Sequence, residues 1–152
     1  MTPGLIRAGV VTERVAWVRE MIRSARALPT ETFDDFIADA RNIAAAESYL
    51  RRGIEALLDL GRHILAKGFA VAVTEYKEIG PKLNAEGVLS ENYGTLLRQI
   101  AGYRNRMVHF YHEVSRNELY LLCTANLEDV EDILEALVAW LGANPDRVDQ
   151  KI

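Results

Sequence analysis

Apolar side chains recur every three or four positions along most of this 152-residue chain, which is the period of an amphipathic α-helix. The first such stripe predicts a helix over about residues 5–28, closed by Pro29. A second, longer stripe runs over about residues 33–65, with Thr32 as the expected N-cap and Gly68 as the expected end. We therefore expect one helix before Pro29 and a second, unbroken helix after it.

Further helices are expected in the second half of the chain. Ser90 is the expected cap of a third long helix that reaches Val108, and a fourth runs from about Asn126 to Gly142. Residues 74–87 predict a short helical piece, and residues 117–123 (NELYLLC) fit either a strand or a helix.

The order of these segments predicts the fold class. The sequence has no strand–helix alternation and no internal repeat, so we expect an all-α, up-and-down helical bundle of four main helices plus short helices. One domain would span residues 1–152, with residues 1–28 as an additional N-terminal helix and residues 143–152 as a C-terminal tail, frayed at its end.

Composition limits the class of protein further. Apolar residues make up 49% of the chain, enough for a sizeable core. The single cysteine, Cys123, excludes an internal disulfide and fits a reducing cytoplasm, where we expect it as a small buried apolar residue. No apolar run is long enough for a membrane span, and the first twenty residues do not resemble a signal peptide. A cytoplasmic protein without a membrane contact is expected.

Charge is unevenly distributed along the chain. The net charge is −4, which disfavours a general nucleic-acid-binding protein. Residues 98–116, however, contain four arginines and only one acid, Glu113. Any affinity for a polyanion is therefore expected to be local to this stretch.

The stretch RNRMVHFYHE, residues 104–113, contains the candidate chemistry. Asn105 and His109 are four residues apart and share a helix face, whereas Arg104 is about 140° around the axis from His109. Arg104 and His109 converge on one ligand if the helix loosens near the histidine, and Tyr111 follows directly. Histidine moves protons near neutral pH and arginine binds phosphate oxygens, so together they suit cleavage of a phosphodiester beside a ribose 2′-hydroxyl. The alternative is a helix end with ordinary surface arginines.

One acidic residue falls on the apolar stripe of the second helix. Glu47 lies seven residues from both Ala40 and Ile54, so it is expected to be buried with a partner such as Arg104. If the helix drifts, Glu47 instead reaches water or pairs with Arg51. Both interpretations remain open from the sequence.

Other polar pairs carry less information. Asp59 and His63 are four apart and fit an Asp–His pair on the outer face or separate surface hydrogen bonds. Neither paired Glu-x-x-His motifs, nor a His-Glu-x-x-His motif, nor a nucleotide-binding glycine motif occurs. We therefore expect no metal and no cofactor.

The spacing of Arg104, Asn105, His109 and Tyr111 resembles the Arg-x4-His-x-Tyr signature of HEPN domains, specifically the HepT-like toxin branch. The resemblance covers about residues 33–141. It includes ESYLRRGIEALLDLGRHIL, where Asp59 and His63 match an Asp-x3-His pattern of that branch. It also includes EIGPKLNAEGVLSENYGTLLRQIAGYRNRMVHFYHEV. Residues 1–28 carry less of the resemblance.

This resemblance implies a function and a set of roles. It implies a homodimer whose two motif regions face each other across a cleft, with metal-independent endoribonuclease activity toward an RNA substrate. His109 would be the acid or base, Arg104 would hold the scissile phosphate, and Asn105 would orient the pair or contact the substrate. Tyr111 would line the cleft. Glu47, chosen from its place on the apolar stripe and not from the resemblance, is a further candidate for binding or orienting the substrate.

The resemblance also implies a toxin with a cognate nucleotidyltransferase antitoxin that adds AMP to Tyr111. A bulky anionic group on Tyr111 would occupy the phosphate-binding charge of Arg104. Two alternatives share the fold. One is a non-catalytic helical module that docks a nucleotidyltransferase or binds nucleotide, and the other is a purely structural bundle.

Overall fold

The described residues of the computed structural model, 3–109 and 114–152, fold almost entirely into helices, and an isolated bridge is their only β-type pairing. This confirms the predicted all-α class. In chain order, the helices are α1 (Ala8–Arg26), α2 (Phe33–Ile37), α3 (Ala40–His63), the π-helical turn η1 (Ile64–Gly68), the 3-10 turn η2 (Tyr76–Glu78), α4 (Ile79–Ala85), α5 (Glu91–His109), α6 (Arg116–Cys123), α7 (Leu127–Ala143) and the 3-10 turn η3 (Pro145–Arg147).

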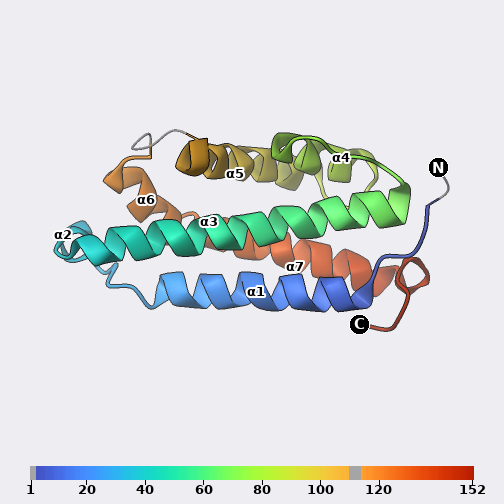
Figure 1. Cartoon of the computed structure of the whole chain (residues 1–152), viewed down its shortest axis with the longest axis horizontal. Coiled ribbons are helices and arrows are strands. Elements are labelled where there is room, and N and C mark those ends of the chain that lie inside the picture. The colour runs from blue at the N-terminus through green and yellow to red at the C-terminus, as the bar shows by residue number, and fades with distance from the viewer. Residues whose placement is uncertain (1–2, 110–113) are drawn as a thin grey trace.

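The four long helices α1, α3, α5 and α7 form the bundle. In Figure 1, α3 crosses the middle of the molecule, with α1 below it and α4 and α5 above it. Helix α7 packs against α1, α3 and α5, and the short helices α2 and α6 contact each other at the end where α3 begins. The centre is apolar, and Leu57, Leu97 and Ile133 have no solvent exposure. None of the helices within the described ranges is both long and apolar enough to traverse a lipid bilayer.

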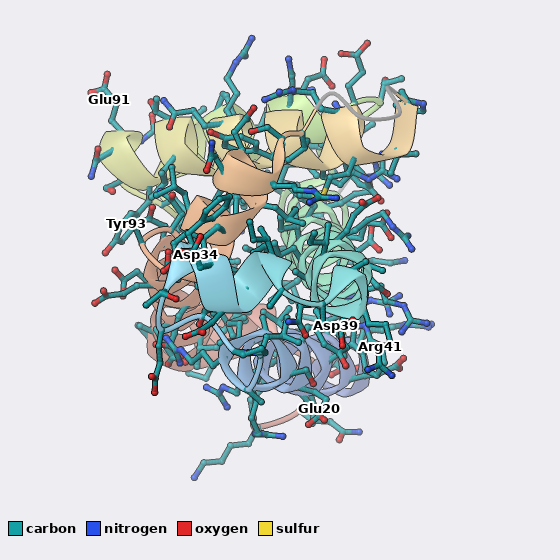
Figure 2. All side chains as sticks on the ribbon, turned by 90° about the vertical axis from the view of Figure 1, so that its left-hand side faces the viewer. Glu20, Asp34, Asp39, Arg41, Glu91 and Tyr93 are labelled. Atoms are coloured by element: carbon teal, nitrogen blue, oxygen red, sulfur yellow. The ribbon has the colours of Figure 1, made fainter. Side chains whose placement is uncertain are left out.

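The prediction of one unbroken helix over residues 33–65 is wrong, because the helix is interrupted at Asp39. Thr32 caps α2 as expected, since its Oγ1 accepts the Asp35 N–H at 3.0 Å. Asp39 has an extended backbone and caps α3, its Oδ1 accepting the Arg41 N–H at 2.9 Å. Figure 2 shows Asp39 and Arg41 side by side at this position, where the guanidinium also binds the carboxylate at 2.7 Å. A short polar side chain that bonds its local backbone thus interrupts an apolar stripe that continues past it.

The C-terminal residues are also more ordered than predicted. The Ile6 N–H donates to the Arg147 carbonyl at 2.8 Å, and the Asp149 N–H donates back to the Ile6 carbonyl at 2.9 Å. Asp149 Oδ1 then accepts the N–H of Ala8, the first residue of α1, at 2.8 Å. The prediction of a frayed tail is therefore wrong for residues 147–149, which pair with the N-terminal segment and cap α1.

A close backbone contact sets the position of α5. A Cβ added to Gly80 on α4 would lie 2.2 Å from the Gly94 carbonyl oxygen, and one added to Gly94 would lie 2.8 Å from the Gly80 oxygen. Only glycine at both positions permits this approach. Ser90 begins α5 as predicted, because its Oγ accepts the Tyr93 N–H at 3.1 Å. The glycine contact therefore fixes η2 and α4 against α5, which carries Arg104, Asn105 and His109.

Candidate functional site

The second half of α5 lines an open groove with the segment before α4 and the end of α3. The groove has a volume of about 520 Å³. We call it the arginine groove, and it is lined by Arg62, Thr74, Glu75, Tyr76, Lys77, Arg104, Asn105 and His109. Three segments that are distant in sequence thus bring several cationic side chains, one amide and one carboxylate, Glu75, to one surface.

A second hollow adjoins the arginine groove. It has a volume of about 720 Å³ and shares Lys77, Asn105 and His109 with the arginine groove. Its remaining lining residues are Gln99, Gly102, Tyr103 and Arg106. A Cβ added to Gly102 would lie 3.6 Å from Lys77 Cε, so the lysine chain passes over the α5 backbone here. Lys77, Asn105 and His109 therefore form a shared wall between two open depressions.

Arg104 is held in place from several directions. Its Nε donates to Glu55 Oε1 on α3 at 3.1 Å, and its Nη1 donates to Asn105 Oδ1 at 3.3 Å. Its guanidinium carbon lies 4.7 Å from the centroid of the Tyr76 ring. Arginine has five N–H donors, and these two bonds use two of them. Arg104 is thus oriented by its neighbours and retains donors for an anion, although its side chain is only 18% exposed.

Tyr76 links two arginines to one carboxylate. Its hydroxyl donates to Asp59 Oδ1 at 3.0 Å, and the guanidinium carbons of Arg62 and Arg104 each lie 4.7 Å from its ring centroid. Burial, and then the neighbouring Asp59 carboxylate, raise the pKa of Tyr76. The tyrosine therefore stays protonated and donates to Asp59 at neutral pH.

His109 is the last residue of α5, and its side chain is exposed to solvent. It lines both depressions, so Arg104, Asn105 and His109 all face the arginine groove. An exposed imidazole beside oriented N–H donors can exchange protons with a bound substrate. Tyr111, the predicted modification site, lies outside the described residues.

Glu47 does not join this site. It is exposed on α3, so of the two interpretations of the sequence the buried, Arg104-paired one is wrong. The carboxylate that binds Arg104 belongs to Glu55, two helical turns further along α3, which also lies 3.5 Å from Arg51. Ile54 and Leu58 are buried on the side of α3 where Glu47 is exposed, so the buried face of this helix is narrower near its beginning.

The predicted Asp59–His63 pair has separate partners. Asp59 accepts from Tyr76, whereas His63 Nε2 accepts the Arg7 N–H at 3.0 Å, at the beginning of α1. Burial, followed by the positive charges of Lys67, Arg7 and Arg14, lowers the pKa of His63. His63 is therefore a neutral acceptor that anchors the N-terminal segment, and it does not line either depression.

Residues that sequence reasoning missed include Glu55, Arg62, Tyr76 and Lys77. Tyr76 and Lys77 lie in a short 3-10 turn without an apolar period, so nothing in the sequence indicates that they reach α5. The sequence did contain one indication, a second acid at position 55 of the same helix, four residues after Arg51. Its contact with Arg104 is visible only in the structure.

Other polar and aromatic side chains near these elements have contacts of their own. Arg106 binds Glu118 of α6 through bonds of 2.8 and 3.1 Å, which lowers the pKa of Glu118. Cys123 is buried as predicted, and burial raises its pKa to about 11, so the thiol stays protonated at neutral pH. Trp17 is 41% exposed. Across the described ranges, no three His, Cys, Asp or Glu side chains gather as metal ligands would.

A family model described as "Ribonuclease HepT-like" matches residues 18–137, most of the chain. The chain belongs to the HepT-like family. The family match begins inside α1 and ends inside α7, so it includes the whole of the arginine groove.

Solved structures share the fold of this HepT-like chain. One is a tri-AMPylated HEPN toxin of Shewanella oneidensis in complex with an MNT antitoxin, with 19% identity, a TM-score of 0.78 and coverage of 86% of this chain and 97% of that chain. Another is a toxin–antitoxin structure with AMP-PNP, with 18% identity, a TM-score of 0.78 and coverage of 86% and 98%. A third is the Bacillus subtilis cytosolic protein YutE, with 20% identity, a TM-score of 0.72 and coverage of 88% and 90%. Among curated proteins, none matches the chain by sequence.

Proposed function

We propose that this HepT-like protein is the toxin of a toxin–antitoxin pair and cleaves RNA as a metal-independent endoribonuclease. The observation that supports this most directly is that Arg104, Asn105 and His109 line one solvent-open groove. Arg104 is oriented there by Glu55 and Tyr76, and His109 is accessible to solvent. This combination supplies a fixed positive charge and an imidazole that can transfer a proton.

The chemistry follows from these two groups. The 2′-oxygen of a ribose attacks the adjacent phosphorus, so the P–O2′ bond forms and the P–O5′ bond of the next nucleotide breaks. The 2′-hydroxyl loses a proton and the departing 5′-oxygen gains one. His109 carries one of these transfers, and the N–H groups of Arg104 stabilise the negative charge that develops on the phosphoryl oxygens. Asn105 helps to hold Arg104, because its amide oxygen accepts from that guanidinium.

A homodimer would complete the site. The chain carries a net charge of −4, and a single groove offers few cations to a polyanion. Two grooves related by a two-fold axis would double the arginines and lysines along an RNA strand and bring a second His109 close to the first. The second histidine can then take the opposite proton transfer.

The cognate partner in this proposal is a nucleotidyltransferase antitoxin that attaches AMP to Tyr111. One structural neighbour is a tri-AMPylated toxin in complex with an MNT antitoxin, which supports this choice of partner. Tyr111 follows His109 by two residues, so a nucleotide attached there would compete with RNA for the donors of Arg104.

The test is cleavage of total RNA by the purified protein in the presence of a chelator. We expect the wild type to cleave and both His109→Ala and Arg104→Ala to lose activity. Arg98→Ala is the matched control, because Arg98 is an exposed arginine of the same helix that lines neither depression. Cleavage that survives both groove substitutions would reject the assigned mechanism.

A non-catalytic module is the second candidate function. The observation that favours it is the limited exposure of Arg104, 18%, together with its two hydrogen bonds inside the protein. Such an arginine can hold a phosphate without any reaction. A folded protein that binds RNA or nucleotide in the same assay and yields no product would support this function instead.

A further inference from the structure

Arg62 is a second arginine of the groove whose hydrogen-bonding capacity is not used. Its Nε is buried and has no hydrogen-bond partner among the described residues. The nearest carboxylate oxygen, Asp59 Oδ1, lies 3.9 Å from Arg62 Nη1, beyond hydrogen-bond distance, and already accepts from Tyr76. The ion pair with Asp59 is therefore long and without a hydrogen bond, so it holds Arg62 only weakly.

Stacking holds the side chain where it is. The Arg62 guanidinium carbon lies 4.7 Å from the Tyr76 centroid, the same distance as that of Arg104. A guanidinium that stacks on an aromatic ring keeps its N–H edge available for other partners. The Arg62 side chain is 38% exposed and lines the arginine groove, so part of it is accessible from the groove.

The Tyr76 ring, which both arginines contact, limits the distance between their guanidinium groups. Because each guanidinium carbon is 4.7 Å from one centroid, the two carbons are less than twice that distance apart. Two cations at this spacing repel each other. Asp59 and Glu55 offset the repulsion only in part, since Glu55 is shared with Arg51 and three arginines therefore face two carboxylates. Two successive phosphates of one strand can span such a pair and neutralise both charges.

We propose that Arg62 forms a second phosphate subsite that binds the RNA phosphate next to the scissile one. This proposal rests on the proposed function, in which Arg104 holds the scissile phosphate. The subsite contacts a phosphate that does not react, so it contributes equally to the bound substrate and to the transition state. Its loss therefore weakens binding and leaves the rate at saturating RNA unchanged.

The experiment compares Arg62→Gln with Arg52→Gln in the purified full chain, with chelator present. Arg52 is the matched control, because it is also an α3 arginine stacked on an aromatic residue, Trp17 at 5.8 Å, but lies outside both depressions. The probe is a fluorescein-labelled single-stranded RNA. Its dissociation constant is measured at several salt concentrations in the His109→Ala background, so that the RNA stays intact. Single-turnover cleavage of the same RNA is measured without that background substitution.

We expect Arg62→Gln to weaken binding about tenfold at low salt and to reduce the slope of log K against log salt by about 0.7, the value for one lost phosphate contact on a single strand. The saturating cleavage rate should stay within about twofold of the wild type. Arg62→Lys retains the charge and should restore the salt slope. Its melting temperature and that of Arg62→Gln establish that both variants are folded.

Three results would overturn the subsite. Equal binding and equal salt slopes for Arg62→Gln and Arg52→Gln would remove it and leave the proposed function intact. A loss of saturating rate without a loss of affinity would show that Arg62 acts on the reaction or on Arg104, and not on a neighbouring phosphate. A wild-type protein that neither binds nor cleaves RNA would reject the subsite and the proposed function together.

Discussion

Arginines on the face where α1 meets α7 have surroundings unlike those of the arginine groove. Arg26 binds Glu131 through two bonds of 2.9 and 3.0 Å, and Arg19 binds Glu135 at 2.9 Å. In the groove, Arg62 and Arg104 stack on one tyrosine. On the outer face each arginine makes short bonds from its terminal nitrogens to a carboxylate. In the groove, Arg104 reaches Glu55 through Nε alone, Arg62 lies 3.9 Å from Asp59, and both guanidinium groups share one aromatic ring.

This difference indicates which arginines retain N–H donors that can bind a ligand. A bidentate pair such as Arg26–Glu131 occupies the guanidinium fork, joins two helices and leaves little charge for another molecule. A stacked guanidinium is positioned by its flat face and keeps donors at its edge. Residue type and net charge alone do not separate these two groups, but the contacts of each arginine do.

The largest expected effect comes from exchanging arginine for lysine in both regions. Arg104→Lys keeps the charge but loses the planar fork, so we expect the single-turnover RNA cleavage rate to fall by about 10²–10³-fold. Arg26→Lys should leave that rate unchanged. Equal rates for the two variants would contradict the distinction between the groove and the outer face.

Removal of the ring should have the next largest effect. Tyr76→Leu removes the stack from Arg104, and we expect about a 10- to 100-fold loss of cleavage rate through misplacement of the guanidinium. Tyr76→Phe keeps the ring and loses only the bond to Asp59, so a change of a few-fold is expected. The comparison of the two single-turnover rates separates stacking from hydrogen bonding, and an equal loss in both variants would show that the stack is unimportant.

The outer-face pair should affect stability only slightly. Arg26→Gln breaks the bonds to Glu131, and because both side chains are substantially exposed, we expect a loss of about 1 kcal/mol or less in the free energy of unfolding. Chemical denaturation measures this directly, with cleavage activity as the second readout. If Arg26→Gln remains folded and yet loses cleavage activity, the outer face has a role in cleavage, which would contradict the comparison.

The smallest effect concerns pH. His63 has a lowered pKa, so below about pH 6.5 the unfolded chain takes up a proton that the folded chain resists, and the free energy of unfolding should decrease as the pH falls. Protonation would also displace the Arg7 N–H from Nε2. His63→Gln should flatten this dependence between pH 7.5 and 5.5, as measured by chemical denaturation at each pH. Parallel curves for His63→Gln and the wild type would reject this assignment.

The sequence predicted the parts of the molecule that depend on period and capping. The apolar stripes located α1, α5 and α7, and Thr32 and Ser90 were recognised as caps because their hydroxyls suit that position. The candidate cluster of Arg104, Asn105 and His109 came from spacing and from the family signature. Each of these depends on residues that are close together in the chain.

The predictions that were wrong or missing concern contacts between distant segments, or a local hydrogen bond that ends a helix although the apolar period continues. Asp39 stopped a helix because its side chain bonded the Arg41 N–H. Glu55 binds Arg104, whereas Glu47 is exposed because the buried face of α3 is narrow near the beginning of the helix. Tyr76 reaches the groove only because glycines let α4 approach α5, and no local pattern encodes that approach.

The most direct test of the central claim is an analysis of the ends left by cleavage of a defined RNA oligonucleotide in the presence of a chelator. A reaction driven by Arg104 and His109, with the 2′-oxygen as the nucleophile, predicts a 2′,3′-cyclic phosphate on one fragment and a 5′-hydroxyl on the other. A single 2′-deoxynucleotide at the cleaved position should abolish the products. Fragments that carry a 3′-hydroxyl and a 5′-phosphate, or cleavage that persists at the deoxynucleotide, would contradict the account.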